Sequence, residues 1–390
     1  MKSHCKPFFS LLLSCLMVPL LSCGTGHDDN EKYFLISDNI QIPYWQTAGA
    51  GFTQAASQLK VWSKFAGPDT YDPKAQQQAF QQAVQQKATG ILVSVADPTV
   101  LQDDIDRAIA AGIPVITVDS DAPASKRLFF IGTDNYQAGL MGGRRLAKEL
   151  NGKGNVAVFT IPETSNMKER LRGYRDALEA FPEIKITHIV DFKGDPRVTF
   201  DSATQIIGQD KKERTDAFVC LEALSGKEVA TVLNNNGVKG KIVIAMDTDP
   251  DTLEWIRKGV IAATISQKPF TMTFVGLQML DDLYHHKLKT LDADWARDSF
   301  SPIPSFVDTG SSLVDKSNVD AFAAAQKSAT SSSKKAKFIT RNENAQGPAV
   351  FLCFQPAGFG PGSSTECNLQ DAAPKPGRET ERRGAVVRTE

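Results

Sequence analysis

Two aromatic residues and an amide follow the first strongly apolar segment after the N-terminal leader. Asn39, Tyr44 and Trp45 come after residues 33–37, whose sequence YFLIS predicts a buried strand. In an open α/β sheet, ligands bind at the carboxyl ends of the strands. Aromatic rings suit the apolar C–H faces of a sugar, and amide groups hydrogen-bond its hydroxyls. This stretch favours a carbohydrate site, although on position alone burial of both aromatic rings in the core is an equally good interpretation.

The histidines give no support for catalysis or for a metal site. His27 lies beside the leader, His188 falls in a predicted strand, and His285 and His286 are adjacent rather than four residues apart. We interpret the adjacent pair as solvated residues at a helix end. The sequence also has no G-x-S-x-G elbow, P-loop or G-x-G-x-x-G motif placed after a strand. We therefore expect no catalytic residue, no metal and no cofactor, and a protein that is not an enzyme.

The N-terminus has the pattern of a secretory signal. Lys2 and Lys6 precede an apolar run over residues 8–21 that is too short and too interrupted for a comfortable transmembrane helix. The run ends in LLSCG, which resembles the bacterial lipobox, where cleavage before the cysteine is followed by its lipidation. We predict a signal peptide over residues 1–22, a lipid on Cys23, a polar tether over residues 23–31 and a location in the periplasm or cell envelope. An ordinary signal peptide cut nearby is the alternative.

Charge and cysteine usage exclude other classes. The formal net charge is −1, which gives no electrostatic reason to expect a nucleic-acid partner. The length allows two domains of ordinary size. Beyond the leader only Cys220, Cys353 and Cys367 remain, so no disulfide framework is expected in the main body. We expect Cys220 in the core, and the sequence leaves open whether Cys353 and Cys367 pair.

Strand-like and helix-like segments alternate from residue 33 onward. Near-continuous apolar strands between amphipathic helices predict parallel sheets that are covered on both faces. About five βα units precede Gly132 and about five follow it, so we predict an α/β protein of two doubly wound parallel-sheet lobes with a cleft between them. Asp72, Asp97 and Asp134 are expected to cap helices. After residue 326 the chain becomes polar and rich in proline and glycine, which predicts a disordered tail over residues 327–390.

Several motifs of the chain occur together in the order that one known family shows. Residues 32–326 resemble the periplasmic sugar-binding proteins of the ribose-binding type, which share their fold with the effector domains of LacI-like repressors. The resemblance implies a type I periplasmic binding protein, with two lobes joined by a multi-strand hinge that close on one sugar. The motifs are SDN at 37–39 with PYW at 43–45, GIPVITVD at 112–119, IGTDN at 131–135 with Gly139, ER at 169–170 with GY at 173–174, MD at 246–247 and IAATISQ at 261–267.

The resemblance also implies the ligand-binding positions. The loop after the first strand supplies a polar residue and two aromatics, a carboxylate ends the fourth strand, an arginine begins a second-lobe helix, and an acid and an amide lie near the hinge. An eighth position, Glu222, falls where the ribose binder has an asparagine. The implied set is Asn39, Tyr44, Trp45, Asp119, Arg170, Glu222, Asp247 and Gln267.

Two departures from the family pattern bear on the sugar. The family often has an arginine after the carboxylate at the Asp119 position, whereas this chain has Ser120. Glu222 replaces a neutral amide. Both changes make the pocket more acidic, which argues against ribose itself and leaves another pentose, a hexose, a deoxysugar, a polyol or a more cationic ligand as the alternatives.

The resemblance further implies lobe boundaries and partners. The N-terminal lobe is expected over residues 32–132 and 268–296, and the C-terminal lobe over residues 133–267 and 297–326. Hinge rotation is expected near residues 132–133, 266–267 and 291–304. The expected partner is an ABC permease that receives the sugar from a monomeric binding protein; a receptor or sensor kinase is the alternative. A repressor is rejected because a signal sequence stands where a helix-turn-helix would precede the sensing domain.

Overall fold

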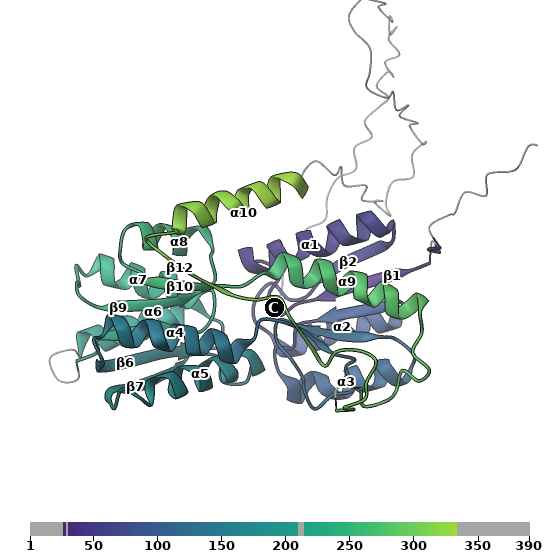
Figure 1. The fold of residues 1–390 in the computed structure, drawn as a ribbon, viewed down its shortest axis with the longest axis horizontal. Helices are drawn as coiled ribbons and strands as arrows, with labels where there is room; N and C mark the ends of the chain where they lie inside the picture. Colours follow the sequence, from purple (N-terminus) through teal and green to yellow (C-terminus); the bar gives the residue numbers. More distant parts are fainter. Residues whose placement is uncertain (1–25, 29, 210–213, 296, 334–390) are drawn as a thin grey trace, which may run out of the picture. The chain divides into compact units, whose positions relative to one another are not determined.

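Two six-stranded sheets with helices packed around them form the described part of the chain (Figure 1). The computed structural model describes residues 26–28, 30–209, 214–295 and 297–333. Cys23, Cys353, Cys367 and the predicted signal peptide lie outside these residues, so the expectations about them are not addressed by the structure. The predicted α/β architecture of two doubly wound lobes is confirmed.

The first sheet has the strand order β11-β5-β4-β3-β1-β2, and all its neighbouring strands run parallel. Its central strands consist almost wholly of buried apolar residues, as expected for a sheet that is covered on both faces. The strands are β1 (Lys32–Ile36), β2 (Trp62–Ala66), β3 (Gly90–Val93), β4 (Val115–Val118), β5 (Phe130–Gly132) and β11 (Phe306–Asp308).

The second sheet repeats this arrangement with the order β12-β10-β9-β8-β6-β7. Its strands run parallel except for β12, which is antiparallel to β10 at the edge. Cys220 ends β8 and is buried, as predicted. The strands are β6 (Lys153–Thr160), β7 (Glu183–Asp191), β8 (Ala217–Cys220), β9 (Ile242–Met246), β10 (Ala263–Ser266) and β12 (Ser312–Asp315).

The helices begin where the sequence places aspartates and prolines. The side chains of Asp72, Asp97 and Asp134 each accept a hydrogen bond from a backbone N–H in the first turn of the helix that follows, which confirms the predicted caps. The first lobe carries α1 (Pro43–Leu59), α2 (Pro73–Gln85), α3 (Pro98–Ala110) and α9 (Pro269–His285). The second lobe carries α4 (Asn135–Glu149), α5 (Ser165–Leu178), α6 (Pro196–Gly208), α7 (Ser225–Asn235), α8 (Pro250–Arg257) and α10 (Val319–Ser333).

Glycines let α4 and α5 approach until their backbones touch. A Cβ atom added to Gly139 would lie 2.2 Å from the carbonyl oxygen of Arg170, and one added to Gly173 would lie 2.3 Å from that of Tyr136. No side chain fits in that space without moving a helix. The contact therefore fixes the position of α5, the helix that carries Arg170.

The chain crosses between the sheets at three places within the described residues. Two follow β5 and β10, at the predicted residues 132–133 and 266–267. The third joins β11 to β12 through residues 309–311, where Gly310 adopts φ +79°. The expectation that this crossing lies within residues 291–304 is wrong, and residues 306–308 belong to the first sheet rather than to the C-terminal lobe. β11 is only three residues long, so it gives too little periodicity to be recognised.

Both ends of the described chain differ from the expected tether and tail. His27 hydrogen-bonds Asp281 at 3.0 Å, and Glu31 is buried, so these two residues of the predicted tether over residues 23–31 contact the first lobe. At the other end, α10 runs beside α8 and continues to Ser333, seven residues into the segment that was predicted to be disordered (Figure 1). Arg257 of α8 donates to the exposed Asp320 of α10 at 2.8 Å, so one ion pair links the two helices. No helix in the described ranges has the length and apolar character needed to cross a bilayer.

Candidate functional site

A small cavity lies between the two lobes at the carboxyl ends of their strands. Its volume is about 60 Å³, below the roughly 300–1,000 Å³ of ordinary ligand pockets. A sugar-sized ligand therefore enters only when the lobes separate. The structure brings all eight predicted site residues to the wall of this cavity: Asn39, Tyr44, Trp45, Asp119, Arg170, Glu222, Asp247 and Gln267. Their contact with a ligand stays a prediction.

Asp119 and Asp247 occupy equivalent places in the two lobes. Asp119 follows β4 and its N–H donates to Ile131 of β5, while Asp247 follows β9 and its N–H donates to Ile265 of β10. Both have left-handed backbone conformations, with φ 64° and 65°. Residues other than glycine adopt this conformation at a cost of about 1–3 kcal/mol, and such strain concentrates at functional sites. The two sheets thus present one carboxylate each to the same cavity.

The Asp119 carboxylate is held by donors from both lobes. Tyr44 donates its hydroxyl to Oδ1 at 2.6 Å, and Asn166 of the second lobe donates to Oδ2 at 3.4 Å. The ring of Trp45 lies edge-on to that of Tyr44, with centroids 5.3 Å apart, and Trp45 is buried. Aromatic surface and a hydrogen-bonding carboxylate therefore meet at one point, as recognition of a hydroxylated ring requires.

Arg170 is the only cation among the described residues that line the cavity. Its three donor nitrogens bond Asn135 Oδ1 at 2.9 Å, the carbonyl oxygen of Leu221 at 2.6 Å and Gln267 Oε1 at 3.0 Å. Gln267 in turn donates to Asp247 at 3.1 Å, so the guanidinium reaches that carboxylate through an amide. This network fixes the orientation of the amide and of the acid near the hinge.

Two predicted ligand residues also hold local structure. Glu222 accepts hydrogen bonds from the backbone N–H groups of Leu224 and Ser225, at 2.8 Å each, and so caps the start of α7. Asn39 accepts from the N–H of Gln41 at 3.0 Å in a side-chain turn. Both oxygens of Glu222 and the single oxygen of Asn39 are engaged by their own loops, which restricts how these side chains can face a ligand.

Three buried carboxyl groups, Asp119, Glu222 and Asp247, and the half-buried Asp38 line the cavity with the single arginine. Burial raises the pKa of Asp38 to about 7, and it raises the pKa of Asp247 to about 7 although Arg170 opposes the shift. Burial also raises the pKa values of Asp119 and Glu222 above their ordinary values. A cavity with this excess of acid favours ligands that donate hydrogen bonds, as hydroxyl groups do.

The raised pKa of Asp247 predicts how stability depends on pH. In the unfolded chain this carboxyl ionises near pH 4, whereas in the fold it ionises near pH 7, so its stabilising contribution is present at low pH and is lost as the pH rises through 7. The free energy of unfolding of Asp247→Asn, measured relative to that of the natural protein, should therefore rise by on the order of 2 kcal/mol when the pH is raised from 5 to 8. Urea unfolding of both proteins at the two pH values measures this difference.

Asp315 supplies the matched control. Its pKa is lowered to about 2, first of all by a hydrogen bond from Arg145, so it is ionised at both pH values in the folded chain. Asp315→Asn should change the free energy of unfolding by a similar amount at pH 5 and pH 8. If the natural protein and Asp247→Asn differ in free energy of unfolding by the same amount at pH 5 and pH 8, the Asp247 carboxyl is not neutral in the folded chain at pH 5.

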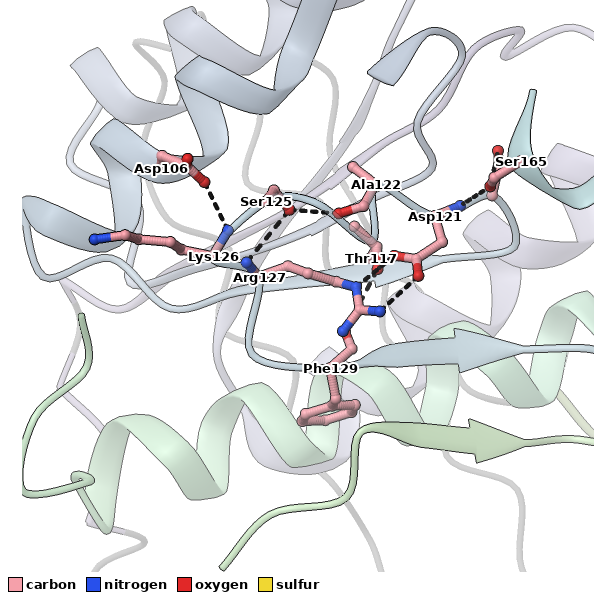
Figure 2. Close-up of polar contacts among 10 residues, drawn as sticks. Asp106, Thr117, Asp121, Ala122, Ser125, Lys126, Arg127, Phe129 and Ser165 are labelled. Atoms are coloured by element: carbon pink, nitrogen blue, oxygen red, sulfur yellow. Dashed lines mark hydrogen bonds and ion pairs between the residues drawn. The ribbon is translucent and has the colours of Figure 1, made fainter. Parts of the chain in front are cut away.

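A brace behind the cavity holds the loop that carries Asp119 and Ser120. Figure 2 shows Arg127 donating to both carboxylate oxygens of Asp121, one of which also accepts from Thr117 at 2.6 Å. The N–H of Asp121 donates at 2.8 Å to Ser165 Oγ, at the first residue of α5 in the second lobe. The brace thus positions the loop and links the two lobes directly.

Several wall residues were missed by sequence reasoning. Asp38 stands beside Asn39 in the same loop, and Asn166 lies one helical turn before Arg170 on the same face of α5. The sequence therefore places each of them next to a predicted site residue. Tyr71 lines the cavity from the loop before α2. Its ring could not be placed because nothing in the sequence indicates that it meets Gly194 of the other lobe.

Comparison with known proteins agrees with this geometry. A model described as a periplasmic binding protein domain matches residues 33–287. The chain belongs to the periplasmic binding protein family. The predicted resemblance to sugar-binding proteins of the ribose-binding type is therefore confirmed, and membership of this family implies an extracytoplasmic location.

Three relatives cover most of the chain. The ribose import binding protein RbsB of Bacillus subtilis is 24% identical over 290 residues, which are 73% of this chain and 93% of the relative. The solved structure of AraP, an arabinose-binding protein from Geobacillus stearothermophilus, is 32% identical, with a TM-score of 0.62, and covers 75% of this chain and 99% of AraP. The XylFII–LytSN complex contains a chain that is 27% identical, with a TM-score of 0.65, over 74% of this chain and 98% of its own.

Proposed function

We propose that this periplasmic binding protein captures a sugar by closing its two lobes and delivers it to an ABC importer. The observation that carries the proposal is the convergence of Tyr44, Trp45, Asp119 and Asp247 around one cavity between the lobes. A carboxylate accepts hydrogen bonds from vicinal hydroxyls, and stacked rings contact the C–H face of a sugar. The names of RbsB and AraP, which bind ribose and arabinose, point to the same ligand class.

The sugar is bound without chemical change. Each lobe contributes a carboxylate at the end of a strand, and a ligand that bridges both lobes favours the closed form, which the membrane partner recognises. The ligand class comprises pentoses, hexoses, deoxysugars and polyols. We further propose that the protein acts as a monomer and that a lipid on Cys23 anchors it in the cell envelope.

A panel of ligands tests the substrate class by thermal shift. A sugar present at about 100 times its dissociation constant adds about 2.7 kcal/mol of stability, which is a clear rise in the unfolding midpoint. Asp119→Ala should abolish this rise, because the side chain that bridges Tyr44 and the ligand is lost. Asp103→Ala, which removes an exposed carboxylate from α3, should leave the rise unchanged. A rise with amino acids or nucleosides but with no carbohydrate or polyol would contradict the proposal.

The XylFII–LytSN complex favours a second candidate function. In that complex a similar binding protein is bound to a second protein, LytSN. The second candidate function is therefore that the sugar-bound form of this chain binds a receptor or sensor kinase instead of an importer. The pocket and the closure would be the same in both cases. Genes for a permease and an ATPase beside this one would support import, and a gene for a sensor kinase would support signalling.

A further inference from the structure

A cluster of two histidines and two carboxylates lies away from the cavity, where the N-terminal segment meets the end of α9. His27 and Glu31 precede β1, and Asp281 and His285 lie one helical turn apart in α9. His285 is the last residue of α9 and is exposed, as interpreted, and its Nε2 also lies 3.3 Å from Glu31 Oε2. Glu31 and Asp281 are both buried, with 2% and 5% of their surface exposed.

The four side chains converge with the spacing that one small cation needs. His27 Nε2 lies 3.0 Å from each Asp281 oxygen, His285 Nε2 lies 3.7 Å from Asp281 Oδ1, and one ligand atom from each of the four residues falls within 4.8 Å of the others. Four ligands at about 2.0–2.1 Å from a tetrahedral zinc ion are separated by about 3.4 Å from one another. The observed separations require only small side-chain movements to match.

Each carboxylate is oriented by a donor outside the cluster and also faces a histidine. The hydroxyl of Tyr33 donates to Asp281 Oδ1 at 2.9 Å, and the N–H of Asp28 donates to Glu31 Oε1 at 2.7 Å. Asp281 Oδ2 then faces His27, and Glu31 Oε2 faces His285. Donors that orient the ligand carboxylates from behind are typical of metal sites.

We propose that His27, Glu31, Asp281 and His285 form a site for a divalent transition-metal ion such as Zn²⁺. Two imidazoles with two carboxylates are a ligand set that zinc accepts, and one dication balances the two buried acids. The ion ties the segment that precedes β1 to the last turn of α9. Ion pairing between the two histidines and the two acids, without metal, is the competing explanation.

Titration of Zn²⁺ into the full chain, purified without a polyhistidine tag, tests the site by calorimetry. We expect one ion per chain and a rise in the unfolding midpoint with the metal. His27→Ala and His285→Gln should each weaken binding at least tenfold, and Tyr33→Phe should weaken it by about 10–100-fold while keeping one ion per chain. The side chain of His285 is 28% exposed, so the fold should tolerate its replacement.

His286→Ala is the matched control, because it removes an exposed imidazole next to the cluster but outside it. Its affinity for Zn²⁺ should equal that of the natural protein. Co²⁺ gives a second measurement, since a four-coordinate site yields strong visible absorption, which His27→Ala should abolish. Equal zinc affinity in the natural chain, His27→Ala and His285→Gln would overturn the proposal. So would a loss of zinc affinity in His286→Ala as large as that in His27→Ala. The proposal would also fail if replacing the histidines lowered the unfolding midpoint while zinc changed the midpoint of no variant.

Discussion

Arg170→Met is expected to destabilise the protein by about 3–5 kcal/mol and to abolish its response to sugar. Arg170 is 2% exposed, and it is the cation nearest to the buried Asp119, Glu222 and Asp247. Removing one partner of a buried charge network leaves the other charges uncompensated, which is the costly way to break such a network. The loss of oriented donors should weaken sugar binding at least about 100-fold. Urea unfolding and calorimetry with the sugar found by thermal shift measure both effects.

Two further variants separate the roles of charge and shape. Arg172→Met, two residues along α5, removes an exposed arginine paired with Glu169 and should change the free energy of unfolding by at most about 1 kcal/mol. Arg170→Lys keeps the charge but not the planar set of donors to Asn135, Leu221 and Gln267, so most of the stability should remain while sugar binding is still weakened. An Arg170→Met protein that melts like the natural one and binds sugar normally would refute this account.

Gly173→Ala is expected to cost about 1–3 kcal/mol, although it adds a single methyl group. The new Cβ atom would lie 2.3 Å from a backbone oxygen and 2.7 Å from a backbone nitrogen of α4, so α5 must move away. Arg170 lies one turn earlier on α5 and moves with it, so a weaker thermal shift with sugar should accompany the lower stability.

Gly208→Ala is the matched substitution for that experiment. It places the same methyl group at the end of α6, where, apart from its own helix and chain neighbours, no atom of the described residues lies within 4 Å. Alanine has the higher helix propensity, so this variant should equal or exceed the natural protein in stability by up to about 1 kcal/mol. If Gly173→Ala unfolds at the same urea concentration as Gly208→Ala, the contact between the α4 and α5 backbones does not limit their packing.

The lobes and the cavity wall were predictable because strong local signals agree with one another. Aspartates before prolines mark the helix starts, and the family resemblance placed Asp119 and Asp247, which follow strands of different sheets, at one ligand site. The crossing at residues 309–311 was missed because β11 has three residues and follows a proline-rich segment. Short strands are defined by their partners in the sheet, and a single sequence does not show those partners.

The metal cluster illustrates a different limit of sequence reading. Asp281 and His285 have the four-residue spacing of a helical metal site, but the spacing between histidines alone does not reveal a pair made of one histidine and one aspartate. Their other two partners come from 254 positions earlier in the chain, in a segment that was expected to be a free tether. Only tertiary structure places that segment on α9.

The hydrogen bond between Asp121 and Ser165 has a consequence for the apparent affinity of the protein for its ligand. This bond and the contact of Tyr71 with Gly194 join the lobes through protein atoms alone. Both contacts break when the lobes separate, so they favour the closed form. A ligand that enters only the open form then binds with an apparent affinity equal to its intrinsic affinity multiplied by the fraction of molecules that are open. These contacts between the lobes therefore raise the apparent dissociation constant of a ligand that enters the open form.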